Sequence, residues 1–292
     1  MSRKALVLLP LIAIACTAIR VANAQIPPKT PDAFLKWSMD RYAKMKTFQA
    51  ECTWSARYGS PNTHITKRRI WIASPNLFRI TSITQNSNYI QMSVCDGEEL
   101  VERTIDSVER EQRYEAPSTI AQAQSMLMQH NMFCGSLLYQ FFGGSKRVTA
   151  LVDTSKSPVK FSTPITLDGQ PCKVVKFWAR GMKYGNVEIA IGAKDGLVRR
   201  IRYDSKGLLK IMASQEGQYL LRNSMRESLK SPEMLARIKE MGQTPEQFFA
   251  SILKTSTPTT ITAIWTTERY TAIKVGQTLS PDTFKVSAAE TE

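Results

Sequence analysis

The stretch RRIWIASPNLFRI, residues Arg68–Ile80, holds two strand-like runs and the turn between them. On both sides of the Ser-Pro-Asn turn, apolar and polar residues alternate with a period of two, which is typical of half-buried strands. Pro75 fixes the turn, and Phe78 and Ile80 then lie on one face of the second strand while Arg79 lies on the other. The stretch predicts an antiparallel hairpin.

The same pattern extends along much of the chain. Residues 48–56 alternate apolar and polar from Phe48 to Ala56. Turns of the type Asp-Gly or Lys-Gly separate further strand-like runs; they are Asp96-Gly97, Asp168-Gly169, Asp195-Gly196 and Lys206-Gly207. Strands that follow one another without helices between them predict an antiparallel meander, and therefore an α+β fold that is mainly antiparallel β.

Three segments interrupt the strands with helical patterns. The first starts at Thr30-Pro31, an N-cap followed by proline at the first helical position, and carries an apolar stripe to Met45. The second, residues 117–144, is apolar on nearly every side and is predicted as a helix or helix pair capped by Ser118. The third, about 218–253, contains the capping box Thr244-Pro-Glu-Gln247. Strands resume at about residue 259.

The N-terminus has the layout of a secretory signal peptide. A basic start and an apolar run precede Ala22-Asn23-Ala24, so we expect cleavage after Ala24 and an exported, periplasmic or extracytoplasmic protein. Two alternatives are an uncleaved membrane anchor and a lipoprotein cleavage site at Ala15-Cys16. Residues 25–292 are predicted to form one domain, with 218–253 as a helical insertion.

Charge and cysteine content limit the partners. The net charge is +14, which outside the cytoplasm favours anionic lipid headgroups or acidic proteins, and no nucleic-acid motif is present. A solvated basic surface without a partner is the alternative. Four cysteines remain after cleavage and permit two disulfides in any of three pairings; they are Cys52, Cys95, Cys134 and Cys172.

The sequence contains few residues and motifs of the kinds that support catalysis. There are two histidines, neither at metal-ligand spacing from another ligand, and no nucleotide or cofactor motif. His130 and Cys134 are four residues apart and would share a helix face as a thiol–imidazole pair. The alternative is a polar gap in a buried helix. We expect no enzyme activity and no cofactor.

In this order, the motifs resemble those of the LolA/LolB lipoprotein-carrier superfamily. Pro75-Asn-Leu-Phe78 stands where that family has PNLF, Asp96-Gly97 where it has its DG turn, and LSPDTFKVS (279–287) where it has its closing strand, with Phe284 as the buried aromatic. The likeness covers about residues 32–215 and 258–287. Ser74 replaces the family's arginine, Val101 stands in place of an aromatic, and residues 218–253 have no counterpart.

The resemblance implies an incomplete, half β-barrel that wraps helices, with a concave apolar face able to receive acyl chains. The ligand-binding residues we expect on that face are Trp54, Trp71, Phe78, Ile80 and Met92. The residues we expect in a helical lid are Met126, Leu127, Met132, Phe133, Leu137 and Leu138. The same face is also compatible with a filled core under permanent helices.

Two functions follow from these expectations. The first is a carrier-like protein that binds a lipid or an acylated protein, with Lys67, Arg68 and Arg69 contacting an anionic headgroup or membrane. Those three cations also fit a solvated strand face. The second is an envelope sensor or protein-interaction domain on the same fold, without lipid transport, whose partner surface is formed by residues 218–253.

Overall fold

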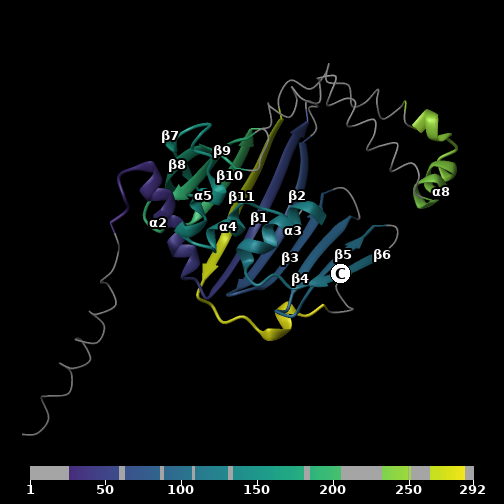
Figure 1. Ribbon diagram of the computed structural model, residues 1–292, viewed down its shortest axis with the longest axis horizontal. Coiled ribbons are helices and arrows are strands. Elements are labelled where there is room, and N and C mark those ends of the chain that lie inside the picture. The colour runs from purple at the N-terminus through teal and green to yellow at the C-terminus, as the bar shows by residue number, and fades with distance from the viewer. Residues whose placement is uncertain are drawn as a thin grey trace, which may run out of the picture.

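One antiparallel sheet dominates the described part of the protein (Figure 1). The computed structural model describes residues 26–58, 63–85, 89–106, 109–130, 134–180, 185–204, 232–248, 250 and 264–286. The eleven strands are β1 (Thr47–Tyr58), β2 (Thr63–Ala73), β3 (Leu77–Thr84), β4 (Ile90–Cys95), β5 (Glu99–Ile105), β6 (Glu109–Glu115), β7 (Lys160–Leu167), β8 (Gln170–Trp178), β9 (Asn186–Gly192), β10 (Val198–Asp204) and β11 (Ile264–Val275).

The strand order shows two meanders joined by the last strand. It runs β6-β5-β4-β3-β2-β1-β11-β10-β9-β8-β7, so β11 pairs with β1 on one side and with β10 on the other. The sheet does not close, because β6 and β7 are its two edges. The expected mainly antiparallel, incomplete barrel is therefore confirmed.

The two turn motifs of the opening stretch meet in space. The side-chain amide of Asn76 donates to the carbonyl of Gly97 at 3.2 Å and to that of Pro117 at 3.1 Å. Gly97 has φ +102°, and a Cβ there would lie 3.2 Å from Leu77 Cδ2. The asparagine after the proline and the glycine of the Asp-Gly turn are thus parts of one junction between β2–β3 and β4–β5.

Four helices lie over one face of the sheet, which we call the inner face (Figure 1). They are α2 (Pro31–Ala43), α3 (Ile120–His130), α4 (Leu138–Phe141) and α5 (Val148–Leu151), with the 3₁₀ turn η2 (Ser145–Arg147) before α5. Buried residues of α2, such as Phe34 and Tyr42, belong to the same apolar cluster as Phe48 and Ile70 of the strands. Burial of this stripe fixes the helix on the sheet.

The turn between β9 and β10 brings the chain close to α2. Gly196 has φ +68°, and a Cβ there would lie 2.8 Å from Arg41 Cδ and 2.9 Å from Trp37 Cζ3. Ser38 Oγ also donates to the Gly196 carbonyl at 2.6 Å. Only glycine fits both the conformation and the approach of the helix.

Register assigns each strand residue to a face, and it corrects part of the expectation. Cys52 pairs with Arg68, which pairs with Ser82, so these residues share the inner face with Phe78 and Ile80. Trp71 pairs with Arg79, and Met92 pairs with Thr81, on the opposite, outer face. The side chains from Trp54 to Met92 that we expected on one apolar face therefore lie on two opposite faces of the sheet.

Several local predictions also have an outcome. Helix α2 begins at Pro31 as expected, and the capping box at Thr244–Gln247 is formed by bonds of 2.9 and 3.2 Å. Helix α3 begins at Ile120 and Thr119 Oγ1 accepts the Gln122 N–H at 3.3 Å, so the expected cap at Ser118 is one residue early. The closing segment is a 3₁₀ turn, η4 (Pro281–Phe284), rather than a strand, although Phe284 is buried.

The remaining helical segment is described only in part. Within 218–253 the structure contains α8 (Pro232–Glu240), which begins at the expected Ser231-Pro232 signal, and a short turn at 245–248. The expected signal peptide, the Lys206-Gly207 turn and the rest of the insertion lie outside the described residues. Among the helices that are described, none has the length and apolar character needed to span a bilayer.

Candidate functional site

The second helical segment covers the inner face of β1–β3, and we call it the cover (residues 120–130 and 134–142). Leu127, Leu137 and Leu138 of the cover are at most 4% exposed and belong to the same apolar cluster as Phe78 and Ile80. Met126 packs against this cluster from the side, whereas Met132 and Phe133 lie outside the described residues. The structure thus brings the expected lid leucines and two of the lining residues together.

Of the other expected lining residues, only Trp54 is on the same side. It is 8% exposed and pairs with Thr66 of β2 on the inner face. The cavities of about 580, 520, 300 and 280 Å³ that open on the described part of the chain are not lined by Trp54, Phe78 or Ile80. Phe78 and Ile80 are each 1% exposed, so with the cover in this position they are covered by the protein's own side chains.

A buried polar cluster ties the cover to the sheet. Arg68 Nη1 donates to Glu268 of β11 at 3.1 Å and to the carbonyl of Gly135 at 3.3 Å. Ser136 Oγ and Tyr270 Oη donate to the other carboxylate oxygen of Glu268, each at 2.6 Å. The Arg68 and Glu268 side chains are 0% and 2% exposed. Cover residues 135 and 136 are therefore held by one charged pair.

Electrostatics favour the ionised form of this arginine. Burial by itself lowers the pKa of Arg68, but the carboxylate of Glu268, together with smaller contributions from Cys52, Tyr139 and Tyr270, more than offsets it, so the pKa lies above its ordinary value. Its Nε and Nη2 atoms are buried and have no hydrogen-bond partner among the residues that the structure describes. A buried guanidinium with one carboxylate and spare donors is a group whose partners can be exchanged.

The inner face becomes polar toward β4 and β5. Gln91, Ser93 and Glu102 are each at most 7% exposed. The Oε1 atoms of Gln91 and Glu102 are buried without a hydrogen-bond partner in the described part of the chain. Burial raises the pKa of Glu102 to about 7. This part of the face suits a hydrogen-bonding group better than a hydrocarbon chain.

The cysteines are free, which corrects the disulfide expectation. Cys52, Cys95, Cys134 and Cys172 are all buried and unbridged. Burial raises the pKa of the Cys134 thiol, and Cys134 Sγ lies 3.5 Å from Ser82 Oγ of β3. A reactive thiol requires a lowered pKa, so this environment does not support the thiol–imidazole alternative. The His130 side chain lies outside what the structure describes. Among the described residues no group of three metal ligands comes together.

The expected headgroup cations do not act as one patch. Lys67 and Arg69 are exposed on the outer face, but Arg68 between them is buried on the inner face. The sequence itself indicates that Arg68 points inward, because it is two and four residues from Ile70 and Ile72 and alternate residues of a strand share a face. Sequence reasoning missed Glu268, Ser136 and Tyr270, which lie about 70 to 200 residues away from Arg68.

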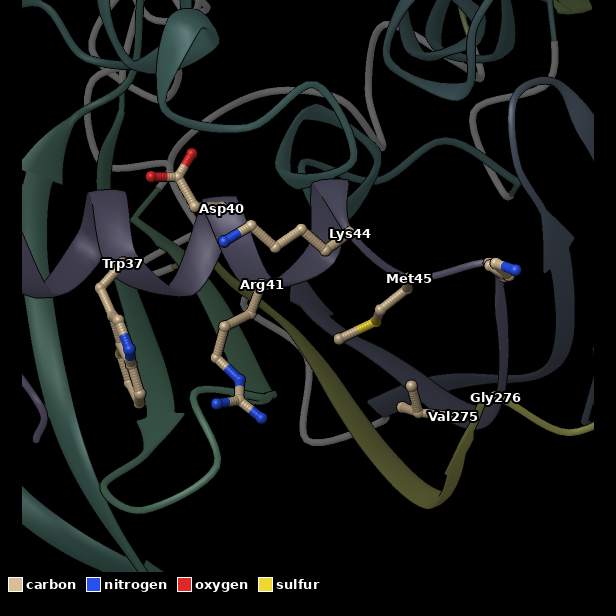
Figure 2. A pocket seen from close by; sticks show the side chains of 8 residues that line it. Trp37, Asp40, Arg41, Lys44, Met45, Val275 and Gly276 are labelled. Atoms are coloured by element: carbon tan, nitrogen blue, oxygen red, sulfur yellow. The ribbon is translucent and has the colours of Figure 1, made fainter. Parts of the chain in front are cut away.

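A second feature is an open groove beside α2 (Figure 2). It has a volume of about 580 Å³ and lies between the C-terminal half of α2 and the end of β11. Its side chains include Arg41, Lys44 and Lys46, with Asp40 as the carboxylate. Arg41 stacks on the ring of Trp37 at 5.5 Å. The groove is separate from the cover.

Comparison with known proteins gives similarity at the level of structure alone. No protein-family model and no curated protein matches the sequence. Among solved structures, MucB is similar with a TM-score of 0.37 and 7% identity over 87% of this chain and 62% of that chain; MucB has also been solved in complex with MucA(peri). The chain therefore spans about three fifths of the MucB chain.

Two further solved structures are similar to this chain over a comparable share of its length. A LolA superfamily protein from Nitrosomonas europaea has a TM-score of 0.32 and 8% identity over 89% of this chain and 99% of that one. A putative outer membrane lipoprotein-sorting protein domain from Vibrio parahaemolyticus has a TM-score of 0.30 and 7% identity over 90% and 97%. The LolA superfamily, which the sequence motifs indicate, is thus among the families whose solved structures resemble this chain.

Proposed function

We propose that the protein is an exported binding protein that holds the acyl chain of a lipid or lipidated partner between the cover and the inner face of the sheet. The observation that carries this proposal is the attachment of the cover. Its main polar anchor is the Arg68–Glu268 cluster. Two longer hydrogen bonds add to it, from the Leu137 N–H to Tyr203 Oη of β10 at 3.3 Å and between Cys134 Sγ and Ser82 Oγ at 3.5 Å. The buried leucines of the cover contribute apolar contacts, which are non-directional. An acyl chain offers the same kind of contact as the leucines that it would displace.

The free energies allow such an exchange. Burial of a leucine side chain contributes about 1.5–3 kcal/mol, so exposing Leu127, Leu137 and Leu138 costs on the order of 5–9 kcal/mol. A chain of about twelve methylenes gains on the order of 10 kcal/mol at ~0.8 kcal/mol each. The two quantities are close, so binding would be reversible, as a carrier requires.

A disulfide that closes the cover tests the proposal. Ser82 Oγ and Cys134 Sγ are 3.5 Å apart. Ser82→Cys therefore places two thiols so close that a small movement lets them form a disulfide. Oxidation would then join the cover to β3. We expect the reduced variant to bind a fluorescent fatty-acyl probe as the wild type does, the oxidised variant to lose binding at least tenfold, and reductant to restore it.

The matched control is Ser82→Cys combined with Cys134→Ser, which keeps the new thiol but removes its partner. Binding by this control should not respond to oxidant, and intact mass under non-reducing conditions verifies the disulfide in the test variant. Equal probe binding by the oxidised and reduced forms would contradict the proposal. So would a wild-type protein that does not bind the probe at all.

A second candidate function is a protein-interaction domain that does not bind lipid. The filled inner face favours it, because Phe78, Ile80 and Leu138 are at most 1% exposed. In that case neither form of Ser82→Cys takes up the probe, and oxidation raises the stability of the fold without changing a binding activity.

A further inference from the structure

Two adjoining hollows lie along α2 and share lining residues; together we call them the α2 groove. The 580 Å³ groove of Figure 2 and a neighbouring hollow of about 520 Å³ share Trp37, Asp40 and Lys44. The second hollow extends past Lys36 to Ile26 at the start of the described chain. The α2 groove therefore runs along the helix from Ile26 to the end of β11 at Val275.

The α2 groove has more positive than negative charge. Its cations are Lys36, Arg41, Lys44 and Lys46, and Asp40 is its one carboxylate. Asp40 Oδ1 already accepts the backbone N–H of Ser145 at 2.8 Å. Lys36 pairs with Asp32 at 2.7 Å.

The other three cations, Arg41, Lys44 and Lys46, have no carboxylate partner in the described part of the chain. Lys44 and Lys46 are also exposed. Because the described residues offer these cations no ionic partner, they can pair with an external anion.

Apolar side chains are exposed at both ends of the α2 groove. Ile26 is 87% exposed and Val275 is 43% exposed. Figure 2 shows Arg41 between Trp37 on one side and Met45 with Val275 on the other. Single exposed apolar residues are ordinary. Together with unpaired cations and an aromatic ring they have the composition of surfaces that bind at a membrane interface.

A purely structural role explains only some of these residues. Arg41 and Lys44 lie in or next to the last turn of α2, where cations interact favourably with the helix dipole. That role does not extend to Lys46, which follows the helix, or to the exposed Ile26 and Val275. An acidic protein segment would match the cations but not the exposed apolar ends.

We propose that the α2 groove docks the protein on an anionic membrane surface. Lys44, Lys46 and Arg41 would contact lipid phosphates, and Ile26 and Val275 would enter the interface beside them. This surface is distinct from the cover and does not depend on an acyl chain being bound there. It also replaces the membrane contact expected at Lys67, Arg68 and Arg69.

Vesicle binding tests this proposal with a charge-matched control. The mature chain is mixed with vesicles of equal parts phosphatidylglycerol and phosphatidylcholine, or of phosphatidylcholine alone, and the bound fraction is measured by co-sedimentation. The test variant is Lys44→Gln with Lys46→Gln. The control is Lys67→Gln with Arg69→Gln, which removes the same charge from the outer face.

We expect the wild type to bind the anionic vesicles only. The test variant should bind them roughly thirtyfold more weakly, since each lysine near an anionic membrane contributes about fivefold to the affinity and two lysines are removed. The control should stay within about threefold of the wild type, and Ile26→Ser should weaken the binding that persists at high salt.

Three results would overturn the proposal. One is the absence of wild-type binding to anionic vesicles. Another is an equal loss in the test variant and the control, which would mean that net charge alone attracts the protein. The third is binding of a glutamate-rich peptide, but not of vesicles, with sensitivity to Lys44 and Lys46; this result would assign the α2 groove to an acidic protein instead.

Discussion

Replacing Arg68 by methionine removes the cation from the buried cluster that holds the cover. Glu268 is 2% exposed and would keep its bonds from Ser136 and Tyr270, but its Oε1 atom would lose the guanidinium 3.1 Å away. Removing one partner of a buried ion pair typically costs about 3–5 kcal/mol, because the other charge remains buried. In a protein of this size that is a fall in Tm of about 6–20 °C.

The assay is urea denaturation followed by tryptophan fluorescence, with two matched variants. Arg69→Met changes the neighbouring exposed residue on the outer face and should alter the free energy of unfolding by less than about 0.5 kcal/mol. Arg68→Met combined with Glu268→Leu removes both charges and should recover most of the lost stability. The double variant thus separates loss of the pair from loss of packing.

Two results would refute this reasoning. The first is a free energy of unfolding for Arg68→Met within about 1 kcal/mol of the wild type, which would mean that Glu268 is solvated or protonated at no cost. The second comes from adding the single variant Glu268→Leu: if its cost and that of Arg68→Met sum to the cost of the double variant, Arg68 and Glu268 are not coupled.

Three further predictions follow from other contacts. Burial raises the pKa of Glu102 from its ordinary 4.5 to about 7, so the folded state resists ionisation of this carboxyl group. The free energy of unfolding should therefore fall by about 1–2 kcal/mol as pH rises from about 5 to 8. Urea titrations should show this fall in the wild type but not in Glu102→Gln. All four cysteines are free, so alkylation of the denatured, unreduced protein should label Cys52, Cys95, Cys134 and Cys172, and fewer labels on the mature chain would reveal a disulfide. Gly97→Ala should destabilise the fold by about 1–2 kcal/mol because φ is +102° and Leu77 is close; Gly169→Ala, which meets nothing within 4 Å, should cost less in the same urea titration.

The fold was largely predictable because its signals are local. Alternation in residues 48–56 and 68–80, together with Asp-Gly turns, specifies antiparallel hairpins without knowledge of the partners. Strand β6, EREQRYE, was missed for the opposite reason. It is an edge strand with almost every side chain exposed, so it has no apolar period, and its charges are what keep such an edge from pairing with other chains.

The faces of individual side chains were less predictable. Trp71 lies between Ile70 and Ile72, and the two isoleucines place it on the outer face despite its size. Met92 belongs to β4, which is buried from Gln91 to Cys95 on both faces. A strand without alternation does not define its own register, which is set by pairing Met92 with Thr81.

The polar anchor of the cover lay beyond sequence reasoning for a different reason. The parity of Arg68 indicates an inward charge, but its partner Glu268 is 200 residues away on the last strand. Insertion of β11 between the two meanders brings them together, and nothing in the local pattern of residues 264–275 specifies that position. Long-range strand order is therefore the information that the motifs lacked.

The most direct test of the proposed acyl-binding function is native mass spectrometry of the mature protein, purified from the periplasm without detergent and then extracted with organic solvent. We predict a stoichiometric acyl-bearing adduct that disappears when Leu137 and Leu138, both buried residues of the cover, are changed to glutamate in a variant that remains folded. A clean apo mass that does not change after incubation with membrane lipids would contradict the account and leave the inner face as a closed core.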